Sequence, residues 1–169
     1  RCIDLAYAAL KVFPDKPIYI LGEIIHNPEV NDQIRDMGIR FLSGPNKVAD
    51  IDDLGADDVV IIPAFGTEVA TLEKLKAKGC QFVDTTCGDV MSAWKRVRNY
   101  AKEEVTSIIY GKAYHEETKA TSSQATSKNG HYLVVLTLEE TDYVCNYIEN
   151  GGDKDEFLKK FEGASRSLI

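Results

Sequence analysis

Residues 59–68 read VVIIPAFGTE, in which four branched apolar residues are followed by a short loop and then by the polar start of a helix. The same order of strand, loop and helix recurs at residues 18–28 and again at residues 107–117. Short runs rich in Val and Ile that alternate with helices are typical of parallel strands buried on both faces. The pattern therefore predicts an α/β fold made of small parallel-sheet α/β/α sandwiches.

The chain of 169 residues is long enough for two small sandwiches of this kind. Further strands are expected at 40–42, 82–83 and 132–136, and a pair of apolar-faced helices is expected near the C-terminal end. A long helix from about Met91 to Lys102 is expected to link the two halves. The expected domains are residues 1–87 and 88–169.

The charge and hydropathy of the chain argue against nucleic acids as partners and against a membrane span. The formal net charge is −7 and no basic patch is visible, which argues against a nucleic acid partner. The longest apolar run is strand-sized and falls short of the roughly 18 residues that span a membrane. We therefore expect a soluble protein without a membrane span. The chain opens on Arg1, inside a helical pattern without a capping residue, so we also expect further sequence upstream.

The four cysteines form no CxxC pair, and no signal peptide is visible, so we expect reduced thiols. Cys87 stands between an expected strand and the long helix, where a helix N-terminus favours a thiolate suited to a metal or to nucleophilic catalysis. A buried structural cysteine is the alternative interpretation. We expect Cys80 and Cys145 to lie in the core and Cys2 to have a structural place on the first helix.

Two histidines follow expected strands, at the edge of the sheet where parallel α/β folds bind ligands. His26 could donate to a phosphate oxygen, although an ordinary loop contact is an equal alternative. His115 and Glu117 form a stronger pair, because together they can offer an anion contact and a proton donor to one ligand. The alternative is that Glu116 and Glu117 are simply favourable charges in the first turn of a helix. His131 follows a turn and is expected at the surface.

Four segments together resemble one known family. They are EIIHNPEVN at residues 23–31, PAFG at 63–66, VDTTC at 83–87 and GKAYHEET at 111–118. In order and spacing they are similar to the 4-hydroxy-3-methylbut-2-enyl diphosphate reductases, also called IspH or LytB proteins. The likeness runs over most of the chain and is closest to the plant and cyanobacterial branch, in which Phe stands at the position of Phe65. By this resemblance the chain is roughly the N-terminal half of such a protein.

The resemblance implies a cloverleaf of three small α/β sandwiches around a four-iron four-sulfur cluster held by three cysteines. Two of these lobes would be present here and the third missing. The family reduces an allylic alcohol diphosphate with two electrons and two protons, and releases water with isopentenyl and dimethylallyl diphosphates. By position, Cys87 matches the middle cluster cysteine. His26 and His115 match histidines that contact the diphosphate, and Glu117 matches the acid that delivers a proton to the leaving hydroxyl.

This sequence departs from the family pattern at several places. The first cluster cysteine of the family lies in a Gly-Phe-Cys motif upstream, so Cys2 does not match it. The third cysteine, a Ser-x-Asn contact and a Thr-Thr loop would follow Ile169. Most members have proline after the cluster cysteine, where this chain has Gly88 and Asp89. His is absent at Phe65, so that contact with the diphosphate is missing or replaced.

Two other functions remain open from the residues alone. The chain could be a non-catalytic module that binds a diphosphate or another anion, or a cysteine-nucleophile enzyme that pairs Cys87 with His115. For the reductase, the resemblance implies ferredoxin or flavodoxin as the electron donor and an allylic diphosphate as the small-molecule partner. We expect a cytoplasmic location, or a plastid if a transit peptide has been lost.

Overall fold

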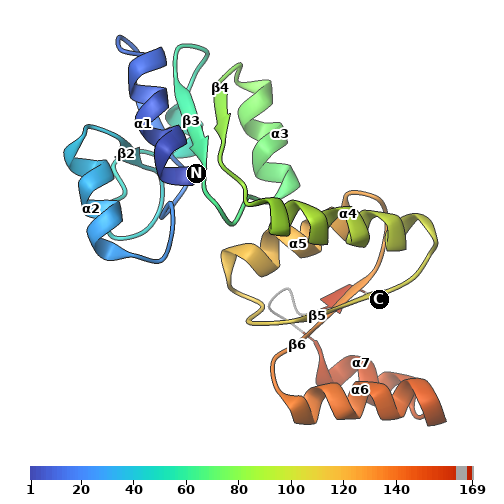
Figure 1. The fold of residues 1–169 in the computed structure, drawn as a ribbon. Coiled ribbons are helices and arrows are strands. Elements are labelled where there is room, and N and C mark those ends of the chain that lie inside the picture. Colours follow the sequence, from blue (N-terminus) through green and yellow to red (C-terminus); the bar gives the residue numbers. More distant parts are fainter. Residues whose placement is uncertain (163–166, 169) are drawn as a thin grey trace. The chain divides into compact units, whose positions relative to one another are not determined.

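The computed structural model describes residues 1–162, 167 and 168, and it divides into two compact units, Arg1–Met91 and Ser92–Ile169. Figure 1 shows the chain coloured from its N-terminus to its C-terminus. In the part of the chain that is described, no helix is both long and apolar enough to cross a membrane. Each unit has a sheet and a hydrophobic core of its own, and each is described separately below.

The sheet of the first unit is four-stranded and entirely parallel. In spatial order its strands are β2 (Arg40–Phe41), β1 (Ile18–Ile20), β3 (Val59–Ile62) and β4 (Gln81–Asp84). Every residue of β1 and β3 is buried, as the continuous apolar runs predict for strands covered on both faces. The carboxyl ends of β1, β3 and β4 therefore lie side by side at one edge.

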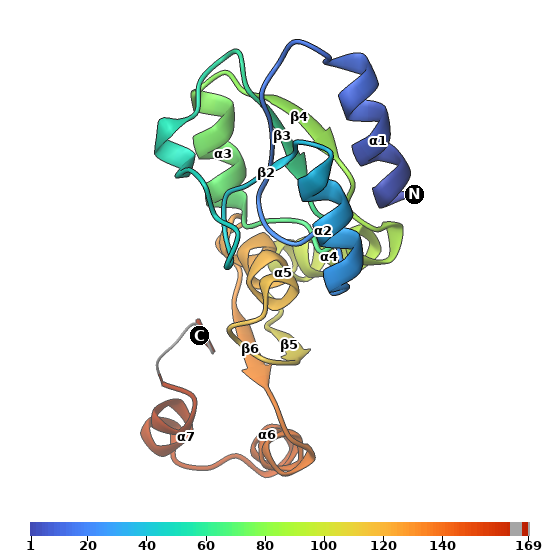
Figure 2. The same ribbon diagram turned by 90° about the vertical axis from the view of Figure 1, so that its left-hand side faces the viewer.

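Helices cover both faces of this sheet (Figure 2). Helices α1 (Cys2–Val12) and α2 (Pro28–Asp36) pack on one face, where Ala6 and Ile34 belong to the same cluster as Ile20 and Ile61. Helix α3 (Val69–Ala77) packs on the other face, with Leu75 against Val60. The 3-10 helix η1 (Ile51–Asp53) also belongs to this second layer. Because successive strand residues point to opposite faces, Ile61 and Val60 supply the two layers from one strand.

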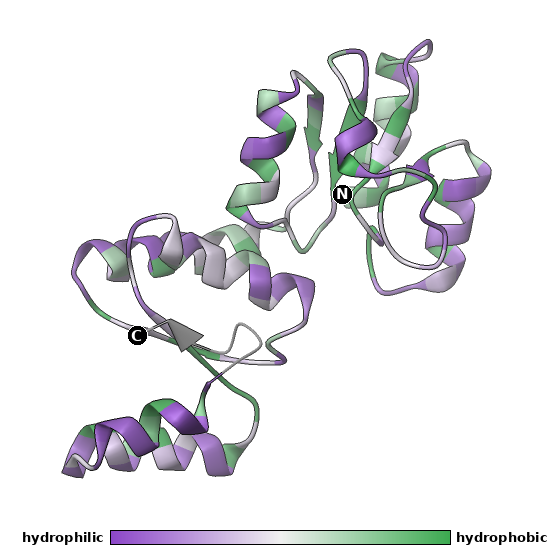
Figure 3. Ribbon diagram, turned by 180° about the vertical axis from the view of Figure 1, so that it is seen from behind, coloured by the Kyte–Doolittle hydropathy of each residue, from purple (hydrophilic) through white to green (hydrophobic). Residues whose placement is uncertain are grey.

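The second unit is built on a three-stranded sheet with the order β5 (Ser107–Tyr110), β6 (Tyr132–Val135) and β7 (Ser167–Leu168). β5 and β6 are parallel, whereas β7 pairs antiparallel with β6. The helices of this unit are most of α4 (Gly88–Lys102), α5 (Glu116–Thr126), α6 (Leu138–Asn150) and α7 (Lys154–Lys160). In Figure 3 the apolar colour runs along β6, and the helices of this unit carry polar and apolar colours together.

Both faces of the second sheet are also covered. On one face, Val144 of α6 and Phe157 of α7 pack with Leu133 of β6. On the other face, Val97 of α4 and Ala125 of α5 pack with Val134. Two side-chain hydrogen bonds tie α4 to α5. They are Trp94 Nε1 to Thr121 Oγ1 at 3.2 Å and Arg98 Nη1 to Gln124 Oε1 at 2.7 Å.

The α/β fold class and the expected strands are confirmed, with two differences of detail. Helix α4 begins at Gly88 rather than near Met91, because the amide N–H of Met91 already donates to the carbonyl of Cys87 at 3.0 Å. Strand β7 was not expected. It has only two residues, which is too short to give a recognisable alternation of apolar and polar positions.

Candidate functional site

Three loops of the first unit, those after β1, β3 and β4, are joined by backbone hydrogen bonds at the carboxyl edge of the sheet. The N–H of Ala64 donates to the carbonyl of Ile24 at 3.3 Å, and the N–H of Cys87 donates to the carbonyl of Ala64 at 2.9 Å. The backbone of Ala64 thus bonds both to the loop after β1 and to the loop after β4. The segments that carry His26, Phe65 and Cys87 are therefore held at fixed distances from one another.

The loop that carries His26 is shaped by two asparagines. Asn27 caps α2, since its side chain accepts from the N–H of Val30 at 3.3 Å, and Pro28 occupies the first helical position. Asn31 is buried. Its Oδ1 accepts from the N–H of Ile24 at 3.0 Å, and its Nδ2 donates to the carbonyl of Ile25 at 2.9 Å. One buried amide side chain thus satisfies the two backbone groups just before His26.

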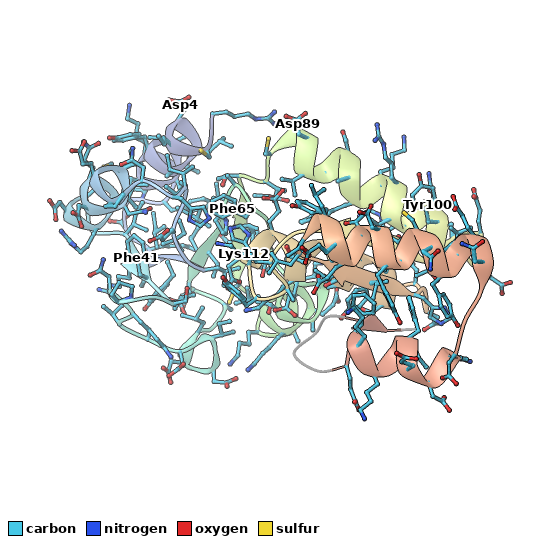
Figure 4. The ribbon with its side chains drawn as sticks, turned by 90° about the horizontal axis from the view of Figure 1, so that it is seen from below. Asp4, Phe41, Phe65, Asp89, Tyr100 and Lys112 are labelled. Carbon is cyan, nitrogen blue, oxygen red and sulfur yellow. The ribbon has the colours of Figure 1, made fainter. Side chains whose placement is uncertain are left out.

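The imidazole of His26 has partners on two sides. Its Nδ1 lies 3.0 Å from Oε2 of Glu23, three residues earlier in the same loop. Its ring is stacked on Phe65, with centroids 4.3 Å apart and an interplanar angle of 20°. Phe65, labelled in Figure 4, comes from the loop after β3. The phenyl ring therefore takes a supporting place beside the histidine, where it offers no hydrogen bond to an anion.

Cys87 lies between β4 and α4, as predicted, and its side chain is exposed. Both threonines before it are buried and hydrogen-bonded: Thr85 Oγ1 donates to the carbonyl of Ile62 at 2.6 Å, and Thr86 Oγ1 donates to Asp84 Oδ1 at 2.6 Å. Cys87 Sγ is 4.0 Å from Oδ2 of Asp89, which projects from the first turn of α4 (Figure 4). The Thr-Thr pair therefore anchors the loop and leaves the thiol at the surface.

In the second unit, His115 and Glu117 lie together at the start of α5. His115 is the N-cap residue, and its Nδ1 accepts from the N–H of Glu117 at 3.2 Å. Glu116 instead pairs with Lys119 at 3.3 Å. Both glutamates are exposed, but as successive residues of a helix they project in different directions. The first turn thus has the Glu116 carboxylate in a local ion pair and, at Glu117, a backbone N–H bonded to the capping imidazole.

Among the described residues, Cys87 can supply one ligand of a metal centre. Among residues 1–162, 167 and 168, no group of three or more His, Cys, Asp or Glu side chains is gathered as a metal ion would require. An exposed thiol at a helix N-terminus has the chemistry to bind iron, because the thiolate is a soft ligand and the helix dipole favours negative charge. A cluster bound through Cys87 therefore needs its other ligands from outside these residues.

Each of three helix starts has the chemistry of an anion contact, and one of them carries a thiol. Helices α2, α4 and α5 each begin next to a predicted site residue, namely His26, Cys87 and His115 respectively. Their first-turn N–H groups and dipoles favour negatively charged ligands. Imidazoles can donate to phosphate oxygens, and a carboxylic acid beside such a site can deliver a proton.

The structure corrects one prediction and supports others among the remaining candidates. Cys145 is exposed on α6, so the prediction that it lies in the core is wrong, whereas Cys80 is buried as expected and donates to the carbonyl of Gly55 at 3.3 Å. Cys2 is half-buried on α1 and packs against the first core cluster. His131 is exposed, as expected.

Three residues with evident positioning roles were not singled out from the sequence. Glu23 contacts His26, Asn31 braces the loop, and Asp84 holds Thr86. Asn31 could have been found from the sequence, because a polar residue on the buried face of a helix usually makes hydrogen bonds there. Asn31 shares that face of α2 with Ile34. Glu23 lies in a loop and Asp84 ends strand β4 just before a loop, and charged residues are usual at both kinds of place and carry no such signal.

Comparison with known proteins gives consistent matches. The family model described as LytB protein matches residues 1–160. Curated relatives include 4-hydroxy-3-methylbut-2-enyl diphosphate reductases of Crocosphaera subtropica, 49% identical over 164 residues, and of Prochlorococcus marinus, 48% identical over 165 residues. These matches cover 97% and 98% of this chain and 40% of each relative. The chain thus spans about two fifths of the length of these relatives.

Two solved structures are similar in fold. One is an (E)-4-hydroxy-3-methyl-but-2-enyl diphosphate reductase, described as the terminal enzyme of the non-mevalonate pathway. It has a TM-score of 0.72 and 26% sequence identity, over 95% of this chain and 57% of that one. The other is the E-1-hydroxy-2-methyl-but-2-enyl-4-diphosphate reductase of Plasmodium falciparum. It has a TM-score of 0.67 over 95% of this chain and 52% of that one, and its 22% identity supports a likeness of fold alone.

Proposed function

This chain belongs to the LytB protein family, and from that premise we propose that it is part of a 4-hydroxy-3-methylbut-2-enyl diphosphate reductase. The reaction removes an allylic hydroxyl group as water, with two electrons and two protons, and yields isopentenyl and dimethylallyl diphosphates. The observation that carries the proposal is the joining of the His26, Phe65 and Cys87 loops at one sheet edge, because it holds an anion contact and a soft metal ligand in one place.

In this proposal the chain supplies two of three lobes, residues 1–87 and 88–169, with the first lobe ending at the cluster cysteine. Cys87 binds one iron of a 4Fe–4S cluster, and the other two cysteine ligands come from residues beyond this chain. When bound, the cluster supplies the electrons and a Lewis-acidic iron for the substrate hydroxyl. A chain with one ligand of three is expected to be inactive alone. Ferredoxin or flavodoxin is the proposed electron donor.

His26 and His115 bind the diphosphate, each at the start of a helix whose N–H groups add to the attraction. The diphosphate is the charged part of the substrate that does not react, so binding it orients the reacting carbon. Phe65 supports the ring of His26 in place of a further donor. These contacts act on the ground state and the transition state alike, and so they determine KM more than kcat.

Glu117 delivers a proton to the leaving hydroxyl group. Hydroxide is a poor leaving group, and protonation by a positioned acid typically accelerates such a step by about 10²- to 10⁴-fold. Its backbone N–H donates to His115 Nδ1, so the acid and the anion contact share one helical turn. A substrate whose diphosphate binds at His115 would then lie next to the helical turn that carries Glu117.

A second candidate function is a module that binds a diphosphate or another anion without redox chemistry. The observation in its favour is that the described residues gather no complete set of metal ligands. Such a module would use His26 and His115 in the same way. It would leave Cys87 without a metal and Glu117 without a catalytic role.

The test uses the full natural protein, reconstituted with iron and sulfide without oxygen and assayed with a one-electron donor. Cys87→Ser should lose most of the bound iron and the cluster spectrum, whereas Cys145→Ser, which changes another exposed cysteine, should keep both. Glu117→Gln should lower kcat by at least about 100-fold. Glu116→Gln, one residue away, should change kcat less than about twofold, since its partner is Lys119. A full iron content in Cys87→Ser, or normal turnover in Glu117→Gln, would contradict the reductase proposal.

A further inference from the structure

We infer that a hollow on the first unit, beside the edge strand β2, is a separate binding site that takes a small organic phosphate. Residues 35, 38–41 and 45–48 line this β2 hollow, which has a volume of about 530 Å³. That volume is within the usual range for small-molecule sites. The inference goes beyond the proposed function and does not depend on it, because none of the residues that function uses lines the hollow.

The β2 hollow is set apart from the loop that carries His26. Helix α2 starts directly after that loop, and Arg35, in the last turn of α2, lines the hollow. The nine residues of α2 span about 13 Å. After α2, Gly38 turns the chain towards β2 with a φ of 93°, a conformation that favours glycine. A ligand in the hollow would thus lie at the opposite end of α2 from His26.

Backbone hydrogen bonds hold the outer wall of the hollow. The chain loops round after β2, and Lys47 forms a parallel bridge with Phe41. The N–H of Val48 donates to the carbonyl of Phe41 at 2.9 Å, and the N–H of Lys47 donates to the carbonyl of Gly44 at 3.2 Å. The wall is therefore fixed by the fold itself, so that binding requires little ordering of the backbone.

Positive side chains line the hollow. Arg35, Arg40 and Lys47 belong to the lining, and no Asp or Glu of the described residues does. This is unusual in a chain whose formal net charge is −7. The carboxylates that pair with Arg35 and Lys47 come from residues outside the lining. These pairs partly neutralise two of the three cations, and Arg40 is therefore the main contact for an anion.

Arg40 is held by an aromatic ring rather than by a carboxylate. Its Nη1 donates to the hydroxyl of Tyr19 at 3.3 Å, and its guanidinium carbon lies 5.7 Å from the centroid of the Tyr19 ring. Within the described part of the chain, Arg40 has no ion pair. Arg40 is exposed, and a guanidinium has five N–H groups, so it can make a forked contact with a phosphate.

The charges and the apolar residues of the lining together indicate the class of ligand. A phosphate group carries about −1.5 to −2 charges at pH 7 and three acceptor oxygens. Three cations on different segments match such a group better than they match a single carboxylate. Pro45 and Val48 are exposed and add apolar surface to the same hollow. The ligand is thus a phosphate attached to a small apolar or aromatic group.

The test is the binding of phenyl phosphate to the full natural protein, measured by calorimetry. Val48→Glu puts a carboxylate into the lining at a residue that is 64% exposed, so the core is undisturbed. This variant should bind at least about tenfold more weakly, because like charges repel. Val105→Glu, the same change at an exposed valine of the second unit, should bind as the wild type does. Equal affinities of the two variants would overturn the inference.

A second pair of variants tests the contact with Arg40. Arg40→Gln should bind phenyl phosphate at least about tenfold more weakly, because a hydrogen bond between charged groups is lost. Arg96→Gln, the same change at an exposed position of α4, should keep the wild-type affinity. Arg40 also contacts Tyr19, so urea denaturation should accompany this pair, and the Val48 pair gives a result that needs no change at Arg40.

Inorganic phosphate should bind more weakly than phenyl phosphate, because it lacks the apolar part. Equal affinities for the two probes would overturn the organic phosphate as the ligand. A wild-type protein that does not bind phenyl phosphate at millimolar concentration would overturn the site itself. The measurements of iron content and turnover on Cys87→Ser and Glu117→Gln decide the proposed function separately, so the failure of one proposal can be told from the failure of the other.

Discussion

The imidazole of His26 lies on the ring of Phe65 with centroids 4.3 Å apart and planes 20° from parallel. The two residues come from the loops after β1 and β3, which are also joined by the hydrogen bond from Ala64 to Ile24. An aromatic pair of this geometry contributes about 0.5–1.5 kcal/mol beyond its buried area. Loss of the stack should therefore measurably weaken the binding of a ligand that His26 contacts.

Phe65→Leu should raise KM for the proposed diphosphate substrate by about two- to tenfold and change kcat little, because an apolar side chain of similar size remains but the flat ring is gone. Steady-state kinetics of the full natural protein would measure both constants. Phe82→Leu is the control, since Phe82 packs against the second core cluster rather than a histidine. It should lower stability and leave KM unchanged. An unchanged KM in Phe65→Leu would show that the stack does not support binding.

Asn31→Ala should lower the free energy of unfolding by about 1–3 kcal/mol, because the buried N–H of Ile24 loses its partner. The carbonyl of Ile25 loses its donor in the same variant. Urea denaturation would measure the change. Gln33→Ala, an exposed change on the same helix, should stay within about 0.5 kcal/mol of the wild type. Equal stabilities of the two variants would rule out a bracing role for Asn31.

Gly88→Ala and Gly130→Ala should act in opposite directions. A Cβ on Gly88 would meet no atom within 4 Å, so alanine should stabilise the start of α4 by about 0.4–1 kcal/mol through the entropy of the unfolded chain. A Cβ on Gly130 would lie 2.3 Å from Cβ of Ala101, so alanine there should cost about 1–3 kcal/mol. Thermal unfolding would show both shifts. A destabilised Gly88→Ala protein would mean that this helix start needs glycine itself.

Cys145 should react with iodoacetamide in the folded protein, and Cys80 should be protected. Cys80 is buried, and burial, with a smaller contribution from Asp58, raises the pKa of its thiol above the ordinary 9.0. The thiolate, which is the reactive form, is therefore disfavoured at this site. Peptide mass spectrometry after timed labelling would compare the two cysteines. Equal labelling rates in the native protein would contradict the burial of Cys80.

The raised pKa of Cys80 also makes the stability of the folded protein depend on pH. Between the ordinary value of 9.0 and the raised value, the unfolded chain loses the thiol proton while the folded chain keeps it. The contribution of Cys80 to stability is thus present below about pH 9 and is lost as the pH rises through that window. Cys80→Ala should remove this part of the alkaline loss, as urea titrations at pH 8 and pH 10 would measure.

The strands and the fold class could be predicted because the apolar runs at residues 18–20, 59–62 and 132–135 are buried along their whole length. Placing His26, Cys87 and His115 after strands followed from the same runs. The failure at Cys145 has a geometric cause. Its neighbours Val144 and Tyr147 face the core, but successive helix residues are turned by about 100°, so Cys145 points elsewhere. The apolar residues next to Cys145 in the sequence therefore did not show on which side of the helix it lies.

The bracing contacts could not be predicted, because they depend on tertiary geometry. Glu23 meets His26 only through the turn that Asn31 imposes, and Asn31 itself bonds backbone groups rather than side chains. Backbone groups have no signature in a sequence. Strand β7 is a similar case, since its pairing with β6 depends on the path of the chain rather than on its own two residues.

The hydrogen bonds through Ala64 make the lengths of the surrounding loops matter more than the side chain at that position. Ala64 contributes only its N–H and its carbonyl to the contacts with Ile24 and Cys87. Substitutions at residue 64 that fit sterically should therefore be tolerated. One residue inserted or deleted between Ile62 and Phe65 would move both backbone partners by more than 3 Å along the chain. The number of residues in this short turn is therefore more tightly constrained than the amino acid at position 64, which need only fit sterically and keep its backbone N–H.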